Sequence, residues 1–313
     1  MTEPHVSHAA ESGFQKLHPK LVDPETAPRP RIKELEVMVA EVIRETPDTA
    51  TLVLFTGNDR LEYQPGHFLT IRPQQFPALD RFCKYFEDMK GRKEPARAYS
   101  LVSAPHERHL AITVKEERYV SGLTKFPPLL SPLLVWRLSP GTRMVVTGFG
   151  GPYVLPNDCE SRTDHIVHIC AGSGSVPNFS ILKHCLAQDM KIRHTMIYGN
   201  KTWDDVIFRR HLDEICRQYP DKVRVVHALS REPDLQESPH VRGGRVNEAL
   251  IREFISDPTA VEVFACGPGI TKFDKQAARE KGEEPQPRFL ESVLDALEAL
   301  GVPDERIHRE SYG

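Results

Sequence analysis

The stretch HICAGSGSVPNFS, residues 168–180, joins an apolar run to a Gly-Ser-Gly turn and then to a predicted helix that begins at Val176 or Pro177. Glycine lets the backbone approach a ligand closely, and the free N–H groups of a helix's first turn attract an anion. Pro177 suits that turn, because its missing N–H is one that has no helical partner anyway. The stretch therefore predicts a phosphate site. AGSGSVP departs from the GxGxxG spacing, however, and a plain strand-to-helix turn is the alternative.

The pattern around this stretch alternates apolar strands with segments of helical period. Such alternation predicts a parallel sheet wrapped by helices. The predicted strands are 165–171, 193–199, 222–230 and 260–267, and the predicted helices are 176–188, 204–219, 246–255 and 287–301.

The first half of the chain has a different pattern, in which apolar and polar residues alternate with period two. Six short strands within about 120 residues predict an antiparallel barrel or sandwich. They are 36–45, 50–56, 66–72, 96–103, 109–117 and 143–155. We expect a flexible arm at 1–32, a barrel domain at 33–157 and an α/β domain at 158–313, with the boundary in the polar stretch LPNDCESRTD.

The segment 73–96 fits neither pattern. Its apolar residues Phe76, Leu79, Phe82 or Cys83, and Phe86 recur at helical spacing. This predicts a short helix that covers local core; the alternative is a lid or docking element beside a cofactor.

Composition excludes several classes of protein. The net charge of −3 gives no basic field for nucleic acid, and no apolar run reaches the roughly 18 residues of a membrane span. The amino terminus lacks a basic-then-apolar export signal, so we expect a cytoplasmic protein. The six cysteines have neither zinc nor iron–sulfur spacing, so we expect reduced thiols and no metal site.

Four motifs in a fixed order carry a resemblance. They are Arg97-Ala98-Tyr99-Ser100, the GxGxxP of 172–177, Cys266-Gly267-Pro268-Gly269 and the terminal Glu310-Ser311-Tyr312. From about Glu34 to Gly313 the chain resembles the ferredoxin–NADP(+) reductase superfamily. The resemblance implies a six-stranded antiparallel flavin-binding barrel followed by a doubly wound parallel-sheet domain that binds pyridine nucleotide.

The resemblance places a flavin on the RxYS strand. Arg97 would hold its pyrophosphate, Tyr99 would offer a flat face to the isoalloxazine, and Ser100 would place a hydroxyl near N5. The alternatives are a surface salt bridge, a core ring and a ladder-facing hydroxyl. The family also uses positions that match Lys115 and Ser131, the latter as the cap of a short helix at the phosphates. Pro132 stands where the family usually has Asn.

The resemblance also implies a reacting centre where nicotinamide C4 meets flavin N5. Its catalytic residues would be Ser100, Cys266, Glu310 and Tyr312, with the Tyr312 ring stacked on the flavin. Simple packing is the alternative for Cys266. Cofactor contacts would come from Arg97, Ala98, Tyr99, Ser100, Lys115, Ser131, Gly172, Gly174, Ser175, Pro177, Ser230, Arg231, Cys266, Gly267, Pro268 and Tyr312.

Ser230 and Arg231 match a pair that binds the 2′-phosphate in NADP-specific members, which favours NADPH over NADH. The same pair occurs in NADH users, and Arg242 and Arg245 are candidates for the family's later ligands. FAD is favoured over FMN, although the residues that would meet the adenine half are not identifiable.

The implied activity is a flavin-dependent NAD(P)H oxidoreductase that passes electrons to a separate acceptor, such as ferredoxin or an oxygenase component. Relatives in oxygenase systems often carry a ferredoxin domain after the E-x-aromatic point where this chain ends. Either the cluster lies on a partner or an iron–sulfur domain has been removed from the chain, and we expect a two-domain reductase. The alternatives are a reductase for haem, flavodoxin or ferric chelates, and a non-catalytic nucleotide-binding regulatory subunit.

Overall fold

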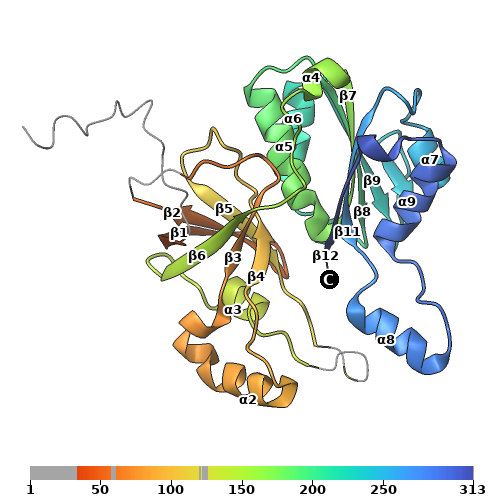
Figure 1. Cartoon of the computed structure of the whole chain (residues 1–313). Coiled ribbons are helices and arrows are strands. Elements are labelled where there is room, and N and C mark those ends of the chain that lie inside the picture. Colours follow the sequence, from red (N-terminus) through yellow and green to blue (C-terminus); the bar gives the residue numbers. More distant parts are fainter. Residues whose placement is uncertain (1–33, 58–60, 120, 122–125, 313) are drawn as a thin grey trace, which may run out of the picture. The chain divides into compact units, whose positions relative to one another are not determined.

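The computed structural model describes residues 34–57, 61–119, 121 and 126–312 (Figure 1). Residues 34–313 form one compact unit that contains two six-stranded sheets. The predicted arm at 1–32 lies outside the described residues, and the predicted boundary at 157/158 stays a prediction.

The first sheet is antiparallel throughout and confirms the predicted strands. Its strand order is β4-β3-β6-β1-β2-β5. Just beyond β4, Leu101 pairs with Ile112 of β5, which joins the two edge strands and closes the sheet into a barrel. The strands are β1 (Glu34–Thr46), β2 (Thr49–Phe55), β3 (Phe68–Ile71), β4 (Arg97–Ser100), β5 (Leu110–Lys115) and β6 (Arg143–Gly150).

Alternation along the strands fixes which face is buried. In β1, Leu35, Val37 and Val39 are buried while their neighbours face outward. The β1–β2 turn is held by Asp48, whose Oδ1 accepts hydrogen bonds from the hydroxyls of Thr46 and Thr49.

The second sheet is parallel throughout, with the order β10-β9-β8-β7-β11-β12. The strands are β7 (His165–Ala171), β8 (Arg193–Asn200), β9 (Val223–Leu229), β10 (Val241–Gly243), β11 (Glu262–Pro268) and β12 (Ile307–Tyr312). The helices around it are α4 (Cys159–Arg162), α5 (Ser175–Ala187), α6 (Arg209–Gln218), α7 (Glu248–Arg252), α8 (Lys272–Lys281) and α9 (Phe289–Ala299).

Helices cover both faces of this sheet, as a doubly wound fold requires. Val167 and Ile169 of β7 pack in one cluster with residues of α7 and α9. Cys170, on the opposite face of the same strand, packs with residues of α5 and α6. Figure 1 shows the two pairs of helices on opposite sides of the sheet.

Several elements differ from the sequence expectation. Strands β10 and β12 and helix α8 were not predicted. The helix predicted at 204–219 is a 3-10 turn η5 (Trp203–Asp205) followed by α6, because Phe208 takes a left-handed conformation (φ +62°) that interrupts a helix.

The segment after β3 confirms the predicted local helix, α2 (Asp80–Lys90), which follows the 3-10 turns Pro73–Gln75 and Pro77–Leu79. Cys83 rather than Phe82 belongs to the buried stripe, with Phe76, Leu79 and Phe86. In the described part of the chain, no helix has the length and apolar character needed to cross a membrane. The cytoplasmic location stays a prediction.

Candidate functional site

The Gly-Ser-Gly turn lies at the carboxyl end of β7, between the strand and α5. Residues Gly172–Gly174 form a 3-10 turn, and α5 begins at Ser175, slightly earlier than predicted, with Pro177 in its first turn. A Cβ at Gly174 would lie 2.1 Å from the Cys266 carbonyl oxygen, so only glycine fits there. This close approach joins the turn to β11.

The hydroxyl of Ser175 stabilises the turn itself. It donates to the Gly172 carbonyl oxygen at 2.9 Å, and the Tyr198 hydroxyl lies 3.0 Å from Ser175 Oγ. The Ser175 backbone N–H is also bonded within the turn, and Pro177 has no N–H, so the backbone N–H groups of the glycine turn are the donors best suited to an anion.

A buried polar network behind the turn was not predicted. Asn178 Nδ2 donates to the Gly174 carbonyl oxygen at 2.8 Å, so its Oδ1 is the acceptor, 2.9 Å from His168 Nδ1. The Nδ1–H of His168 must then donate, which leaves its Nε2 to accept from His194 Nδ1 at 3.1 Å. Burial lowers the pKa of His168 to about 4, so both rings are neutral links between the turn and the sheet.

Strand β4 presents the RxYS residues. Arg97 is partly exposed, Ala98 is exposed, Tyr99 is half-buried and Ser100 is buried. Arg97 also has a partner in the chain: its Nη2 lies 2.9 Å from Glu94 Oε2. Sequence reasoning missed Glu94, which lies three residues before the motif.

The four residues expected at the reacting centre lie together. The Tyr312 hydroxyl donates to Ser100 Oγ at 2.5 Å, and Ser100 Oγ lies 3.4 Å from Glu310 Oε2. Cys266 on β11 lies opposite Glu310 on the neighbouring strand β12. The Tyr312 side chain packs against the hydrophobic cluster that contains Cys266. The last strand of the second sheet thus contacts β4 of the barrel, bringing together residues 210 or more positions apart.

Burial sets the protonation of this group. It raises the pKa of the Glu310 carboxyl to about 7, although the hydrogen bond from Ser100 opposes the shift. Burial also raises the pKa values of the Cys266 thiol and the Tyr312 phenol well above their ordinary values. At neutral pH Glu310 is therefore the group of this cluster that can gain or lose a proton.

Lys115 lies at the end of β5, where its charge is already paired. Its Nζ is 2.8 Å from Asp48 Oδ1 and 3.6 Å from Asp205 Oδ1, so it links the barrel to η5 of the second half. Burial acts to raise the pKa of Asp48, but Lys115 and the neighbouring hydroxyls outweigh it and hold that pKa below its ordinary value. The other oxygen of Asp205 accepts from the Thr202 backbone N–H and hydroxyl.

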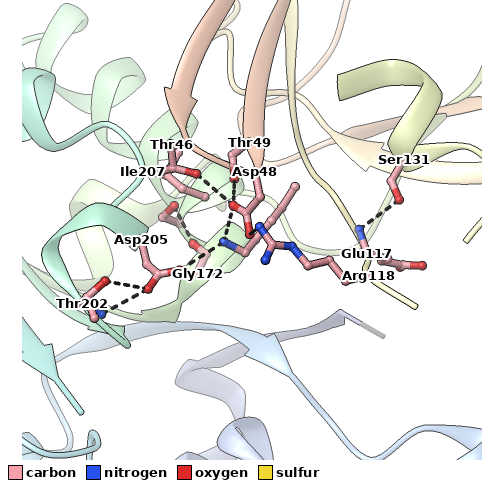
Figure 2. Close-up of polar contacts among 12 residues, drawn as sticks. Thr46, Asp48, Thr49, Glu117, Arg118, Ser131, Gly172, Thr202, Asp205 and Ile207 are labelled. Carbon is pink, nitrogen blue, oxygen red and sulfur yellow. Dashed lines mark hydrogen bonds and ion pairs between the residues drawn. The ribbon is translucent and has the colours of Figure 1, made fainter. Parts of the chain in front are cut away.

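The predicted capping role of Ser131 is wrong. Ser131 is the first residue of the short helix α3 (Ser131–Trp136), and Leu130 occupies the cap position without a side-chain bond. The Ser131 hydroxyl instead accepts from the Glu117 backbone N–H at 3.1 Å, as Figure 2 shows. Because Pro132 follows at once, this helix start offers one backbone donor fewer.

Ser230 and Arg231 follow β9 at the carboxyl edge of the sheet, and both are exposed. Ser230 bonds to the carbonyl oxygen of Asn200, at the end of β8. The Asn200 side-chain amide lies beside the Tyr198 hydroxyl, yet within the described residues neither its oxygen nor its nitrogen has a partner of hydrogen-bonding geometry. Of the later candidates, Arg242 is paired with Glu253 at 3.0 Å and Arg245 is exposed.

The chemistry of these residues fits a flavin and a pyridine nucleotide. Strand β4 presents three groups in succession: a partly exposed guanidinium, a half-buried aromatic ring and a hydroxyl. A guanidinium suits the flavin phosphates, an aromatic ring suits the face of the flavin ring, and a hydroxyl suits its polar edge. At the second sheet, a glycine turn opens α5, and the adjacent strand ends in a buried amide that has no hydrogen-bond partner among the described residues. That amide was missed because one Asn in NKT carries no sequence signal.

Comparison with known proteins agrees with this geometry. Residues 168–275 match the oxidoreductase NAD-binding domain family. The chain is 33% identical, over 285 residues and 89% of its length, to the ferredoxin reductase component of 3-ketosteroid-9-alpha-monooxygenase from Mycolicibacterium smegmatis. It is 28% identical to the protein of the same name from Rhodococcus rhodochrous, over 88% of its length. The chain spans 65% and 64% of the lengths of these relatives.

Solved structures share the fold. The FAD/NAD-binding domain of nitric oxide dioxygenase from Vibrio cholerae aligns with a TM-score of 0.66 at 23% identity, covering 90% of this chain and 100% of that one. Ferredoxin–NADP+ reductase from Plasmodium falciparum aligns with a TM-score of 0.64 at 19% identity, covering 89% and 96%. These structures show that the chain has the two-domain fold of ferredoxin–NADP+ reductase, and the match over residues 168–275 shows that its second half contains an oxidoreductase NAD-binding domain.

Proposed function

We propose that the protein is an FAD-containing NAD(P)H oxidoreductase that passes electrons to a separate one-electron acceptor, a ferredoxin or an oxygenase component. The observation that carries this proposal is the contact of Ser100 on the barrel with Glu310 and Tyr312 on the last strand, beside Cys266. A bound flavin supplies the chemistry, since it accepts hydride from NAD(P)H and releases electrons one at a time.

On the barrel side, the Arg97 guanidinium binds the flavin phosphates. The main chain at Ala98 contacts the flavin next to them, and the Tyr99 side chain lies against the flavin ring. Ser100 supplies a hydroxyl at the reacting edge of the ring. The hydroxyl of Tyr312 already bonds to this one, so Tyr312 covers the position that the nicotinamide needs and must move for it. Glu310 exchanges a proton with solvent near neutral pH, because burial brings its pKa to about 7.

On the nucleotide side, the turn with Gly172 and Gly174 binds the pyrophosphate through its backbone N–H groups. Ser175 and Pro177 open α5 beside this site: Ser175 closes the turn with its hydroxyl, and Pro177 lies against the phosphates without an N–H of its own. Cys266, Gly267 and Pro268 line the nicotinamide site. Gly267 is also required by packing, because a Cβ there would lie 2.4 Å from the Phe289 ring. Lys115 joins the cofactor contacts by exchanging Asp205 for a phosphate. For Ser131, whose hydroxyl holds the Glu117 N–H, we retain only a backbone contact.

Two finer choices rest on single features. We favour NADPH over NADH because the Arg231 guanidinium is exposed beside Ser230 and suits a phosphate dianion. We favour an oxygenase-linked acceptor because the relatives reported above are named as ferredoxin reductase components of a monooxygenase.

A visible absorption spectrum of the purified protein, with release and identification of the chromophore, tests the flavin and separates FAD from FMN. A folded, colourless protein that takes up no added flavin contradicts the proposal. Anaerobic mixing with NADPH should then bleach the flavin bands; bands that never bleach indicate a non-catalytic nucleotide-binding subunit. Reduction of a panel of acceptors identifies the partner: faster reduction of haem proteins, flavodoxin or ferric chelates than of ferredoxin overturns the acceptor assignment.

A further inference from the structure

The segment between β3 and β4 contains a carboxylate that is almost wholly buried. The Glu94 side chain is 1% exposed, and each of its oxygens meets a cation. Oε1 accepts from Lys90 Nζ, and Oε2 accepts from Arg97 Nη2 at 2.9 Å. Arg97 is the residue to which we assign the flavin phosphates.

Helix α2 and its flanks fix this carboxylate in place. The Glu94 backbone N–H donates to Glu87 Oε1 at 3.1 Å, and its carbonyl oxygen accepts from Gln74 Nε2 at 2.7 Å. Lys90 lies 4.8 Å from the centroid of the Phe86 ring, in cation–π contact. Glu94 therefore has little freedom to follow Arg97 if that side chain moves.

The ion pair with Glu94 restrains only one side of the Arg97 guanidinium. Its Nη2 is held by Glu94 and its Nη1 donates to the Pro95 carbonyl oxygen at 2.7 Å. A guanidinium has five N–H donors, so three remain for another acceptor. The Arg97 side chain is 39% exposed, which leaves it accessible to a ligand.

The charges leave the cluster cationic. One carboxylate lies between two cations, and their attraction outweighs burial, so that the pKa of Glu94 lies below its ordinary value and the group is ionised at neutral pH. Glu87, which accepts from the Glu94 N–H, and Lys93 beside it add one charge of each sign, so the net charge of these five groups is +1, which still attracts phosphate.

We propose that Glu94 is a positioning residue for flavin binding: it holds the Arg97 guanidinium in the orientation that receives the flavin phosphates. This inference rests on the proposed function, and it gives the segment 73–96 a role in the cofactor site. Its physical basis is preorganisation, because an arginine that is already oriented loses less side-chain freedom when the ligand binds.

A double-mutant cycle on FAD affinity tests the proposal. Flavin is removed, and FAD is titrated into wild type, Glu94→Gln, Arg97→Ala and the double variant, with fluorescence quenching as the readout. We expect Glu94→Gln to raise the dissociation constant roughly tenfold and to have no further effect once Arg97 is alanine. The matched control is Asp80→Asn, which removes an exposed carboxylate of α2 paired with Lys84 and should leave the affinity unchanged.

Two further measurements separate positioning from damage to the fold. Riboflavin lacks phosphate, so its affinity should be equal in wild type and Glu94→Gln. If Glu94→Gln does not fold, Glu94→Asp replaces it: this variant keeps the charge for Lys90 and is expected to lose FAD affinity for lack of reach to Arg97.

The possible results are distinct. Glu94→Gln could lower FAD affinity just as much in the Arg97→Ala background, or could weaken riboflavin binding equally. Either result overturns the proposal in favour of a purely structural carboxylate. Tighter FAD binding by Glu94→Gln also overturns it, because Glu94 would then compete with the phosphate. A wild type that binds no flavin contradicts the proposed function, whereas a wild type that binds FAD as weakly as Glu94→Gln contradicts this inference alone.

Discussion

At the scale of single residues, Glu310 couples the fold to pH. Burial raises its pKa from an ordinary value of 4.5 to about 7, against the effect of the Ser100 hydroxyl. The folded chain thus holds this proton more tightly than the unfolded chain. The stabilising contribution is complete below about pH 4.5 and is lost as the pH rises through about 7.

Glu310→Gln stays neutral at every pH. We therefore expect its free energy of unfolding to rise relative to that of wild type by on the order of 1–3 kcal/mol as the pH increases from 5 to 8. Cys266 and Tyr312 do not titrate in this window, since burial raises both of their pKa values. Urea unfolding of both proteins at four pH values measures the difference in free energy of unfolding. A difference that does not change with pH would contradict the elevated pKa.

Arg231 tests the choice of nucleotide. Its side chain is exposed just after β9, and its backbone N–H is fixed to the Lys201 carbonyl oxygen at 2.8 Å. We expect Arg231→Ala to raise the KM for NADPH roughly 10- to 100-fold and to leave the KM for NADH nearly unchanged, because only NADPH carries the 2′-phosphate. Arg224→Ala, an exposed arginine at the opposite end of the same strand, is the control. Equal effects of Arg231→Ala on both nucleotides would remove the 2′-phosphate role.

At the scale of elements, the turn between β7 and α5 uses its two glycines for different reasons. Gly172 has a left-handed backbone (φ +52°) with open space around it, whereas a Cβ at Gly174 would strike the Cys266 carbonyl. Gly172→Ala should cost about 1–2 kcal/mol, through conformational strain alone. Gly174→Ala should cost about 3 kcal/mol and should also weaken nucleotide binding, because the turn and β11 must separate. Thermal unfolding and nucleotide titration of both variants measure this order, and equal effects would show that the close approach is not a constraint.

The elements themselves show where sequence reasoning succeeds. Strands such as β1 and β7 were predicted because alternation or an apolar run reports burial directly. Strand β12, with the sequence IHRESY, was missed because it lies at the sheet edge and its polar residues face solvent or neighbouring elements. Helix α8 was missed for a similar reason, since Ala278 is its one buried residue.

The candidate site was predictable to the extent that motifs mark it. The contacts of Ser100 with Glu310 and Tyr312 follow from the order of the motifs, although the residues lie far apart in the chain. The partners of Arg97 and Lys115 were not predictable, because Glu94, Asp48 and Asp205 are ordinary acidic residues until the fold brings them into contact. The capping error at Ser131 has the same origin: its hydroxyl bonds to Glu117, from a different segment.

At the scale of the whole molecule, polar contacts join the two halves, among them the ion pairs Lys183–Glu107 and Lys115–Asp205 and two hydrogen bonds from hydroxyl groups. Ser180 of α5 donates to the Ser103 carbonyl oxygen at 2.7 Å, with both residues buried, and the Tyr312 hydroxyl donates to Ser100. Ser180→Ala leaves the buried Ser103 carbonyl without its donor and Tyr312→Phe leaves the Ser100 hydroxyl without its donor, and each loss costs about 1–3 kcal/mol. Because the loss falls on the junction, it should weaken the coupling between the halves more than the stability of either half.

The chain has two tryptophans, Trp136 in α3 beside the barrel and Trp203 in η5 of the second half. Single-tryptophan variants, Trp136→Phe and Trp203→Phe, therefore report on one half each. In the wild-type background we expect both reporters to give the same urea midpoint, because residues 34–313 form one compact unit.

With Ser180→Ala and Tyr312→Phe added, the two midpoints should separate. Ser161→Ala, which removes an exposed hydroxyl bonded to the Asp158 carbonyl oxygen within one segment, should leave them together. Midpoints that stay together without both junction hydroxyls would show that other contacts set the coupling, and midpoints that already differ in wild type would show that the halves unfold independently.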